Sequence, residues 1–194
     1  MKKIVVLITG YIGSGKTIVA NYLSERYGIP VFNSDDEAKQ LYNDPIILAS
    51  VNEIVGGSII SDDGTLDKVS LGKIIFNDSD KKKQLEEFIH PLVRKRFNEW
   101  KDIQNCPIVF MESALALKRG RKGFDYVVFV KASKSVRLER AMKRDNTSED
   151  KIRQRMKSQK FDLSLVDFII DNEYDFHESA DKCIEEIYKL FCVQ

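Results

Sequence analysis

The sequence predicts an α/β fold, a three-layer sandwich in which a parallel sheet lies between two layers of helices. Three observations predict this fold: short apolar runs alternate with helical patterns, a glycine-rich loop joins the first run to the first helix, and polar residues directly follow the other runs. Apolar strands separated by helices are typical of parallel sheets that are buried on both faces. Right-handed crossovers then give a doubly wound sandwich.

Each element of this fold has its own signal in the sequence. The predicted strands are runs of Val, Ile, Leu, Phe, Met and Tyr at residues 4–8, 31–32, 108–111, 126–130 and 168–170. The predicted helices have apolar residues at spacings of three and four, and they cover about 18–27, 134–144, 148–160 and 177–191. No linker or internal repeat divides the chain.

The loop between the first strand and the first helix is a complete phosphate-binding motif. Residues 10–17 read Gly-Tyr-Ile-Gly-Ser-Gly-Lys-Thr, which matches G-x-x-x-x-G-K-[ST]. Such a loop turns backbone N–H groups toward a phosphate at the positive end of a helix dipole. The expected nucleotide contacts are Ile12, Gly13, Ser14, Gly15, Lys16 and Thr17. Lys16 reaches the β- and γ-phosphates and the Thr17 hydroxyl is placed for Mg²⁺, so the motif predicts a nucleoside triphosphate site.

Composition excludes some classes of function. Of 194 residues, 43% are hydrophobic and 31% are charged, which suits one soluble globular domain. The 31 Lys and Arg residues are almost balanced by 30 Asp and Glu residues. The protein therefore has no overall positive charge large enough to bind nucleic acid without specificity. The three cysteines are widely spaced and predict neither a disulfide framework nor a metal-ligand pair.

The first residues predict the compartment. Met-Lys-Lys leads directly into a strand, without an apolar signal-peptide segment, and the apolar run at 4–8 is too short to span a bilayer. We therefore expect a cytoplasmic protein with no membrane partner, acting as a monomer or a small homo-oligomer.

The segment from about 36 to 105 predicts a helical insertion, because it lacks strong strand signals. Its longest stretch, at about 79–104, carries apolar residues on one helical face: Leu85, Phe88, Ile89, Leu92, Val93, Phe97 and Trp100. Pro91 lies inside this pattern, and we expect a kink or a break after Ile89.

A second feature, a basic stretch at about 137–160, narrows the class of phosphate-loop protein. Arg140 and Arg144 are four residues apart, which places them on one helical face. Arginine forks neutralise the phosphoryl oxygens during transfer without losing their proton. A solvated basic helix face is the alternative interpretation. Short kinases for small molecules combine a helical insertion over the acceptor with a basic lid over the donor, and the lid is expected here at about 145–164. No Asn-Lys-x-Asp element indicates a GTPase.

Two acidic residues follow predicted strands. Asp35 follows the second strand, at the edge where ligands bind in open α/β sheets, and could orient an attacking hydroxyl. Capping of the next helix is the alternative role for this carboxylate. Glu112 ends the third strand and is a candidate for holding Mg²⁺ through water; its alternative is a structural role.

The order of these motifs resembles the dephospho-coenzyme A kinase family over nearly the whole chain. Thr9 to Thr17 resembles the family's T-G-G-I-G-S-G-K-S, with Tyr11 in place of a glycine. Val31 to Asp35 is similar to its V-I-D-A-D. Further matches follow in the family's order at residues 63–67, 71, 75–76, 89–93, 138–145, 153–156, 159 and 167–172.

The resemblance implies a nucleoside-kinase-like fold and transfer of the ATP γ-phosphate to the ribose 3′-hydroxyl of dephospho-coenzyme A, the last step of coenzyme A synthesis. It implies that Lys16, Thr17 and Mg²⁺ hold the donor and that Asp35 acts as the general base or orients the hydroxyl. It further implies that Arg144 clamps phosphate and that Arg140 stacks on adenine. His90 and Arg94, within the insertion, are possible acceptor contacts; a capping or packing role before Pro91 is the alternative for His90. One domain results, with a core at about 1–35, 106–144 and 165–194.

Besides Tyr11, two residues depart from the family pattern. Asn33 replaces an aspartate, and Lys118 stands where the family often has an acid. Two other functions remain open: a different nucleoside or nucleotide kinase of the same architecture, and an ATP-binding regulatory module that never transfers phosphate.

Overall fold

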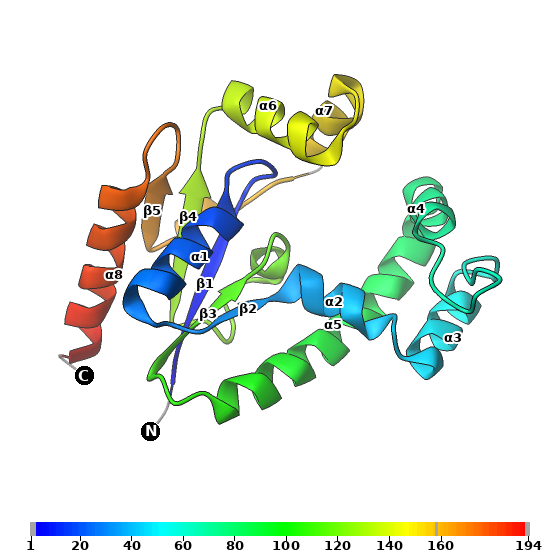
Figure 1. The fold of residues 1–194 in the computed structure, drawn as a ribbon, viewed down its shortest axis with the longest axis horizontal. Helices are drawn as coiled ribbons and strands as arrows, with labels where there is room; N and C mark the ends of the chain where they lie inside the picture. Colours follow the sequence, from blue (N-terminus) through cyan, green and yellow to red (C-terminus); the bar gives the residue numbers. More distant parts are fainter. Residues whose placement is uncertain (1–2, 158, 193–194) are drawn as a thin grey trace. The chain divides into compact units, whose positions relative to one another are not determined.

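A computed structural model, which describes residues 3–157 and 159–192, is built around one parallel sheet (Figure 1). The strand order is β2-β3-β1-β4-β5, and every neighbouring pair is parallel. The strands are β1 (Ile4–Gly10), β2 (Val31–Asn33), β3 (Ile108–Glu112), β4 (Tyr126–Lys131) and β5 (Phe168–Asp171). The predicted α/β fold class and its five strands are confirmed.

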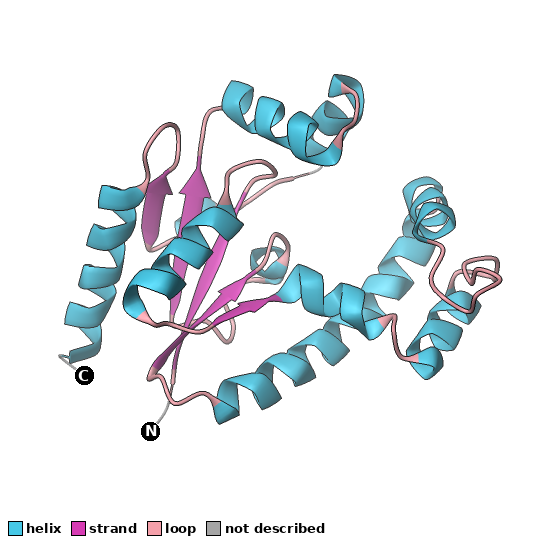
Figure 2. Ribbon diagram, in the orientation of Figure 1, coloured by secondary structure: helices cyan, strands magenta, loops and turns pink. Residues whose placement is uncertain are grey.

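Helices connect these strands (Figure 2). They are α1 (Lys16–Tyr27), α2 (Ser34–Leu41), α3 (Pro45–Ile54), α4 (Lys68–Asn77), α5 (Ser79–Ile103), α6 (Lys134–Asp145), α7 (Glu149–Lys157) and α8 (His177–Cys192). Two short 3₁₀ helices, η1 (Ala116–Arg119) and η2 (Leu163–Leu165), were not predicted.

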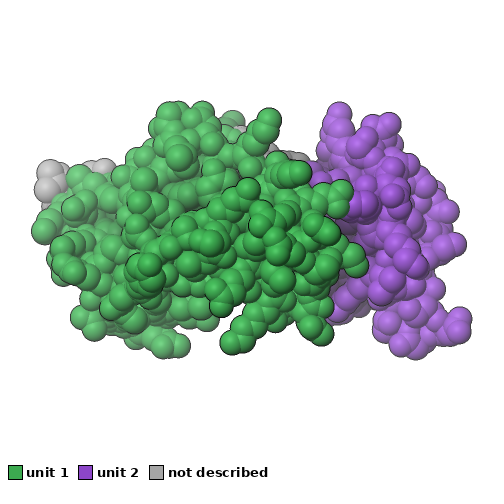
Figure 3. Space-filling model, turned by 90° about the horizontal axis from the view of Figure 1, so that it is seen from above, with its two compact units in different colours: residues 1–33, 104–194 green, residues 34–103 purple. Residues whose placement is uncertain are grey.

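The contacts between Cα atoms divide the chain into two compact units (Figure 3). Unit 1 contains residues 1–33 and 104–194, and unit 2 contains residues 34–103. Unit 1 therefore carries the whole sheet and the phosphate-binding loop. Unit 2 carries the helices α2 to α5.

The core of unit 1 explains why both faces of the sheet are apolar. Every residue of β1 is buried, and its side chains point alternately to the two faces. Ile4, Val6 and Ile8 pack on one face with side chains of α1 and α8, which both cover that face (Figure 1). Val5 and Leu7 are buried on the other face. This double burial fixes the parallel sheet, and with it the edge at which the loops gather.

Helix α5 organises unit 2. Its buried residues are Leu85, Ile89, Val93 and Phe97, and α2, α3 and α4 all contact it. The break expected after Ile89 does not occur, because α5 runs without interruption through Pro91. Proline removes one backbone donor from the helix. Burial of the apolar face on both sides of Pro91 outweighs that loss.

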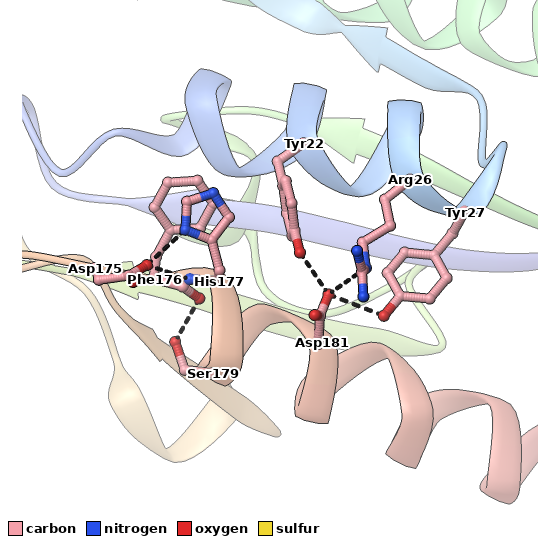
Figure 4. Close-up of polar contacts among 8 residues, drawn as sticks. All are labelled: Tyr22, Arg26, Tyr27, Asp175, Phe176, His177, Ser179 and Asp181. Carbon is pink, nitrogen blue, oxygen red and sulfur yellow. Dashed lines mark hydrogen bonds and ion pairs between the residues drawn. The ribbon is translucent and has the colours of Figure 1, made fainter.

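A polar cluster joins α1 to α8 within unit 1 (Figure 4). The hydroxyl groups of Tyr22 and Tyr27 donate hydrogen bonds to Oδ1 of Asp181, at 2.8 and 2.9 Å, and Nε of Arg26 lies 3.1 Å from the same oxygen. Partial burial alone would raise the pKa of Asp181. The two hydrogen bonds and the charge of Arg26 outweigh it, so the pKa is lowered.

Replacing Asp181 with asparagine is therefore expected to lower the free energy of unfolding at pH 7 by about 1–2 kcal/mol. Because the folded-state pKa of Asp181 is lowered, its charge stabilises the fold above the unfolded pKa of about 4, and the benefit disappears as pH falls through the folded pKa. Urea unfolding of both proteins at several pH values measures this. A difference that stays constant from pH 7 to pH 3 would contradict it.

Among the described residues, no helix is both long and apolar enough to cross a membrane.

Candidate nucleotide-binding site

The phosphate-binding loop lies at the carboxyl end of β1, the central strand of the sheet, and leads into α1. Gly13 and Gly15 adopt left-handed backbone conformations, with φ of 76° and 88°. Tyr11 does not share this conformation, since the positive-φ residues other than glycine in the described chain are Ser58 and Asn146. The tyrosine therefore fits the loop without backbone strain. The first turn of α1 carries no acidic residue, so its N-terminus can receive an anion.

Three residues from distant parts of unit 1 hold the loop in place. Nδ2 of Asn172 donates to the carbonyl of Ser14 at 2.8 Å, and Oε1 of Gln159 accepts from the N–H of Ile12 at 2.6 Å. The third contact is the backbone of Arg137, beside Gly13. In the sequence, Asn172 and Gln159 stand out only as matches to the family pattern, which does not predict their contact with the loop. Position along the chain could have suggested Asn172, because it directly follows the last strand at the same sheet edge.

Gly13 is the position in the loop where a side chain is least tolerable. A Cβ there would lie 2.1 Å from the carbonyl oxygen of Arg137. We expect Gly13→Ala to lower the thermal midpoint and to weaken ATP binding at least tenfold, measured by scanning fluorimetry and calorimetry. Gly28→Ala is the matched control: Gly28 also has a positive φ, of 66°, but a Cβ there meets nothing within 4 Å. An equal fall in thermal midpoint in both variants would show that the backbone strain of a positive φ, and not the clash with Arg137, causes the loss of stability.

Glu112 connects the loop to the neighbouring strands. In the register of the sheet it lies between Ile8 of β1 and Asn33 of β2. Its carboxylate accepts hydrogen bonds from the hydroxyl of Thr17 at 2.8 Å and from Nδ2 of Asn33 at 3.0 Å, and it is only 6% exposed. The structure thus brings Thr17 and Glu112, the two expected metal residues, into direct contact.

This oxygen set fits a magnesium ion of the phosphate-loop type. Mg²⁺ in such sites takes one or two protein oxygens, with waters and phosphate oxygens completing the octahedron. Thr17 and Glu112 offer a hydroxyl and a carboxylate at the same point. In residues 3–157 and 159–192, no three His, Cys, Asp or Glu side chains gather as a separate metal centre.

Two of the expected nucleotide contacts, Lys16 and Ile12, have different surroundings. Nζ of Lys16 lies 3.4 Å from the carbonyl oxygen of Tyr11, so the lysine folds back along the loop. The Ile12 side chain is buried with residues of α6 and α7, including Leu138 and Ile152. Since its N–H also points to Gln159, Ile12 anchors the loop in this structure.

The two arginines of α6 have different surroundings. Arg140 donates to the backbone carbonyls of Asn172 at 2.8 Å and Glu173 at 3.3 Å, and its guanidinium lies beside Gly15. Arg144 donates twice to the carboxylate of Asp145, at 2.7 and 3.2 Å. Hydrogen bonds from Arg144 lower the pKa of Asp145 despite its partial burial. At neutral pH this carboxylate is therefore charged, and a phosphate must compete with it for Arg144.

The remaining candidate residues lie in unit 2. Helix α2 begins at Ser34, so the exposed Asp35 is inside its first turn rather than at a cap position preceding it. His90 and Arg94 are one turn apart on α5, where His90 is half-buried and Arg94 is exposed. The side chain of Lys118 lies outside the described part of the structure.

Comparison with known proteins identifies the family. The family model for dephospho-CoA kinase matches residues 4–178. A dephospho-CoA kinase of Bacteroides fragilis is 38% identical over 172 residues, which is 86% of this chain and 83% of that protein. The enzyme of Hahella chejuensis is 33% identical over 189 residues, covering 92% of this chain and 90% of that protein.

Solved structures agree. TT1252 from Thermus thermophilus superimposes with a TM-score of 0.84 at 25% identity, covering 97% of this chain and 98% of that one. Dephospho-CoA kinase from Campylobacter jejuni gives 0.64 at 26% identity, with 96% of each chain covered. A shikimate kinase from Bacteroides thetaiotaomicron, at 14% identity and a TM-score of 0.53, shares the fold. The match of sequence, fold and phosphate-loop geometry leads to one conclusion: this chain belongs to the dephospho-CoA kinase family.

Proposed function

We propose that this protein transfers the γ-phosphoryl group of ATP to the ribose 3′-hydroxyl of dephospho-coenzyme A, giving ADP and coenzyme A. The main observation behind the proposed ATP site is the contact between the Thr17 hydroxyl, in the first turn of α1, and the buried carboxylate of Glu112. It joins a phosphate cradle to a metal-compatible carboxylate, which phosphoryl transfer needs. Family membership supports the choice of acceptor.

Each donor-site residue has a proposed task. The phosphates are bound by the backbone N–H groups of residues 13–17. The Lys16 ammonium stabilises the negative charge that develops on the β- and γ-oxygens. Thr17 and Glu112 hold Mg²⁺, which neutralises phosphate charge when bound. Asn33 keeps the Glu112 carboxylate in position through its amide.

On the acceptor side, Asp35 receives the proton of the attacking hydroxyl or orients it. His90 and Arg94 of unit 2 are proposed contacts of dephospho-coenzyme A. The segment at about 145–164 acts as the lid. Arg144 leaves Asp145 to clamp a phosphate oxygen, and Arg140, next to Gly15, borders the adenine. On this proposal, the helical insertion cradles the acceptor and the sheet core binds ATP.

The test is ADP release from ATP and Mg²⁺, with dephospho-coenzyme A, adenosine, AMP or pantothenate derivatives as acceptor. Strong stimulation by dephospho-coenzyme A alone, lost when EDTA removes the metal, is the expected result. Stimulation by another acceptor would leave a kinase with a different substrate. Tight ATP binding without stimulation by any acceptor would favour a regulatory module.

A further inference from the structure

The Tyr11–Ile12 peptide group of the loop contacts both Gln159 and Lys16. The N–H of Ile12, which donates to Oε1 of Gln159 at 2.6 Å, belongs to the same planar peptide as the carbonyl of Tyr11. That carbonyl accepts from the N–H of Ser14 at 3.1 Å and lies 3.4 Å from Nζ of Lys16. Because the peptide is planar, an acceptor that fixes its N–H also fixes the direction of its carbonyl.

The ring of Tyr11 provides a second connection to the same part of the chain. It makes edge contacts with Phe161 and Phe129, at centroid distances of 5.0 and 5.3 Å. The guanidinium of Arg137 lies 4.5 Å from the centre of the Tyr11 ring. Gln159 and Phe161, two residues apart, therefore hold the peptide and the side chain of one loop position.

The loop needs this support because its own backbone is permissive. Gly13 and Gly15, both at positive φ, lie within three residues after the peptide and have no Cβ to restrict them. A loop that is ordered only part of the time binds its ligand more weakly, in proportion to the ordered fraction. An external hydrogen bond that orders it before binding removes that cost.

We propose that Gln159 is a positioning residue of the nucleotide site: it fixes the Tyr11–Ile12 peptide and thereby the place from which Lys16 meets the phosphates. Phe161 supports this arrangement through the ring of Tyr11. The inference rests on the proposed use of the loop for ATP, but it does not depend on which acceptor is phosphorylated. Gln159 acts through the loop, so it needs no contact with substrate.

The test measures binding of a non-hydrolysable ATP analogue with Mg²⁺ by calorimetry, without acceptor. Gln159→Met keeps the length of the side chain and removes the acceptor oxygen, and Gln159→Asn keeps the amide but shortens its reach. We expect each to weaken binding about tenfold, the equivalent of about 1.4 kcal/mol and of one hydrogen bond. Gln154→Met, an exposed glutamine on α7, is the matched control and should stay within about twofold of the wild type.

Two further readouts separate positioning from general destabilisation. In the nucleotide-free protein, the amide of Ile12 should exchange its hydrogen faster in Gln159→Met than in Gln154→Met. In a Lys16→Met background, Gln159→Met should weaken binding much less than tenfold, because its effect passes through Lys16. Wild-type affinity in both Gln159 variants, or a full additional loss in the Lys16→Met background, would overturn the proposal.

The same measurements keep the two proposals apart. If the wild type binds the analogue but does not phosphorylate dephospho-coenzyme A, the proposed acceptor is wrong, and the role of Gln159 is still decided by its variants. If the wild type does not bind the analogue, both proposals fail.

Discussion

Replacing Lys16 with methionine is expected to lower kcat/KM for ATP by about 10²–10³-fold while the protein stays folded. Methionine keeps most of the length of the side chain but carries no charge. The Lys16 ammonium stabilises the transition state more than the bound substrate, because negative charge develops on the phosphoryl oxygens during transfer. It acts together with loop N–H groups that already point in one direction before the reaction. Steady-state ADP release, with circular dichroism as the check on folding, measures the effect.

Lys182→Met is the control for the loss of a lysine. Lys182 is an exposed residue of α8 in the same unit, where it pairs with Glu178 four residues away. Such a pair contributes little to stability, and we expect near wild-type rates. A Lys16→Met enzyme that loses less than about fivefold would mean that backbone N–H groups and the metal bind the phosphates without this lysine.

Replacing Asp35 with asparagine is expected to lower kcat by about 10²–10⁴-fold and to leave the affinity for ATP unchanged. The change keeps the shape of the side chain and removes its ability to accept a proton. Asp35 lies in the first turn of α2, where the backbone N–H groups favour a carboxylate. Because the side chain is exposed, loss of this charge is expected to cost only about 0.3–1 kcal/mol of folding energy. Separate titration of ATP and of dephospho-coenzyme A distinguishes a chemical effect from a binding effect.

Asp36→Asn is the neighbouring control. Asp36 lies in the same turn and pairs with Lys39 at 2.6 Å, both side chains being largely exposed. If the two variants behave alike, then the negative charge of the turn matters rather than Asp35 itself. If ATP affinity falls in Asp35→Asn while kcat is retained, Asp35 belongs to the donor site and another group accepts the proton.

The local elements of this protein could be predicted from its sequence. The strands at 4–8 and 108–111 carry enough consecutive apolar residues to require burial on both faces, and their alternation with helical patterns predicts a parallel sheet. The phosphate-binding loop could be predicted because its chemistry is local: glycines, a lysine and a hydroxyl within eight residues, between a strand and a helix. Thr17 meets Glu112 because the loop leaves the carboxyl end of β1 and Glu112 ends the neighbouring strand β3, a pairing that the sequence does not specify. The catalytic roles of Asp35, Arg144 and His90 stay predictions.

Contacts between distant segments were decided by the tertiary structure. Gln159 and Asn172 meet the loop from 147 and 158 residues away, and no pattern near the loop specifies them. Helix α5 continues through Pro91 because partners in unit 2 bury its apolar face, a gain that local backbone preference cannot report. Periodicity and motifs predict local structure, because they depend on residues that are close together along the chain. Strand order and register determine which side chains share one edge of the sheet, and those depend on the packing of the whole chain.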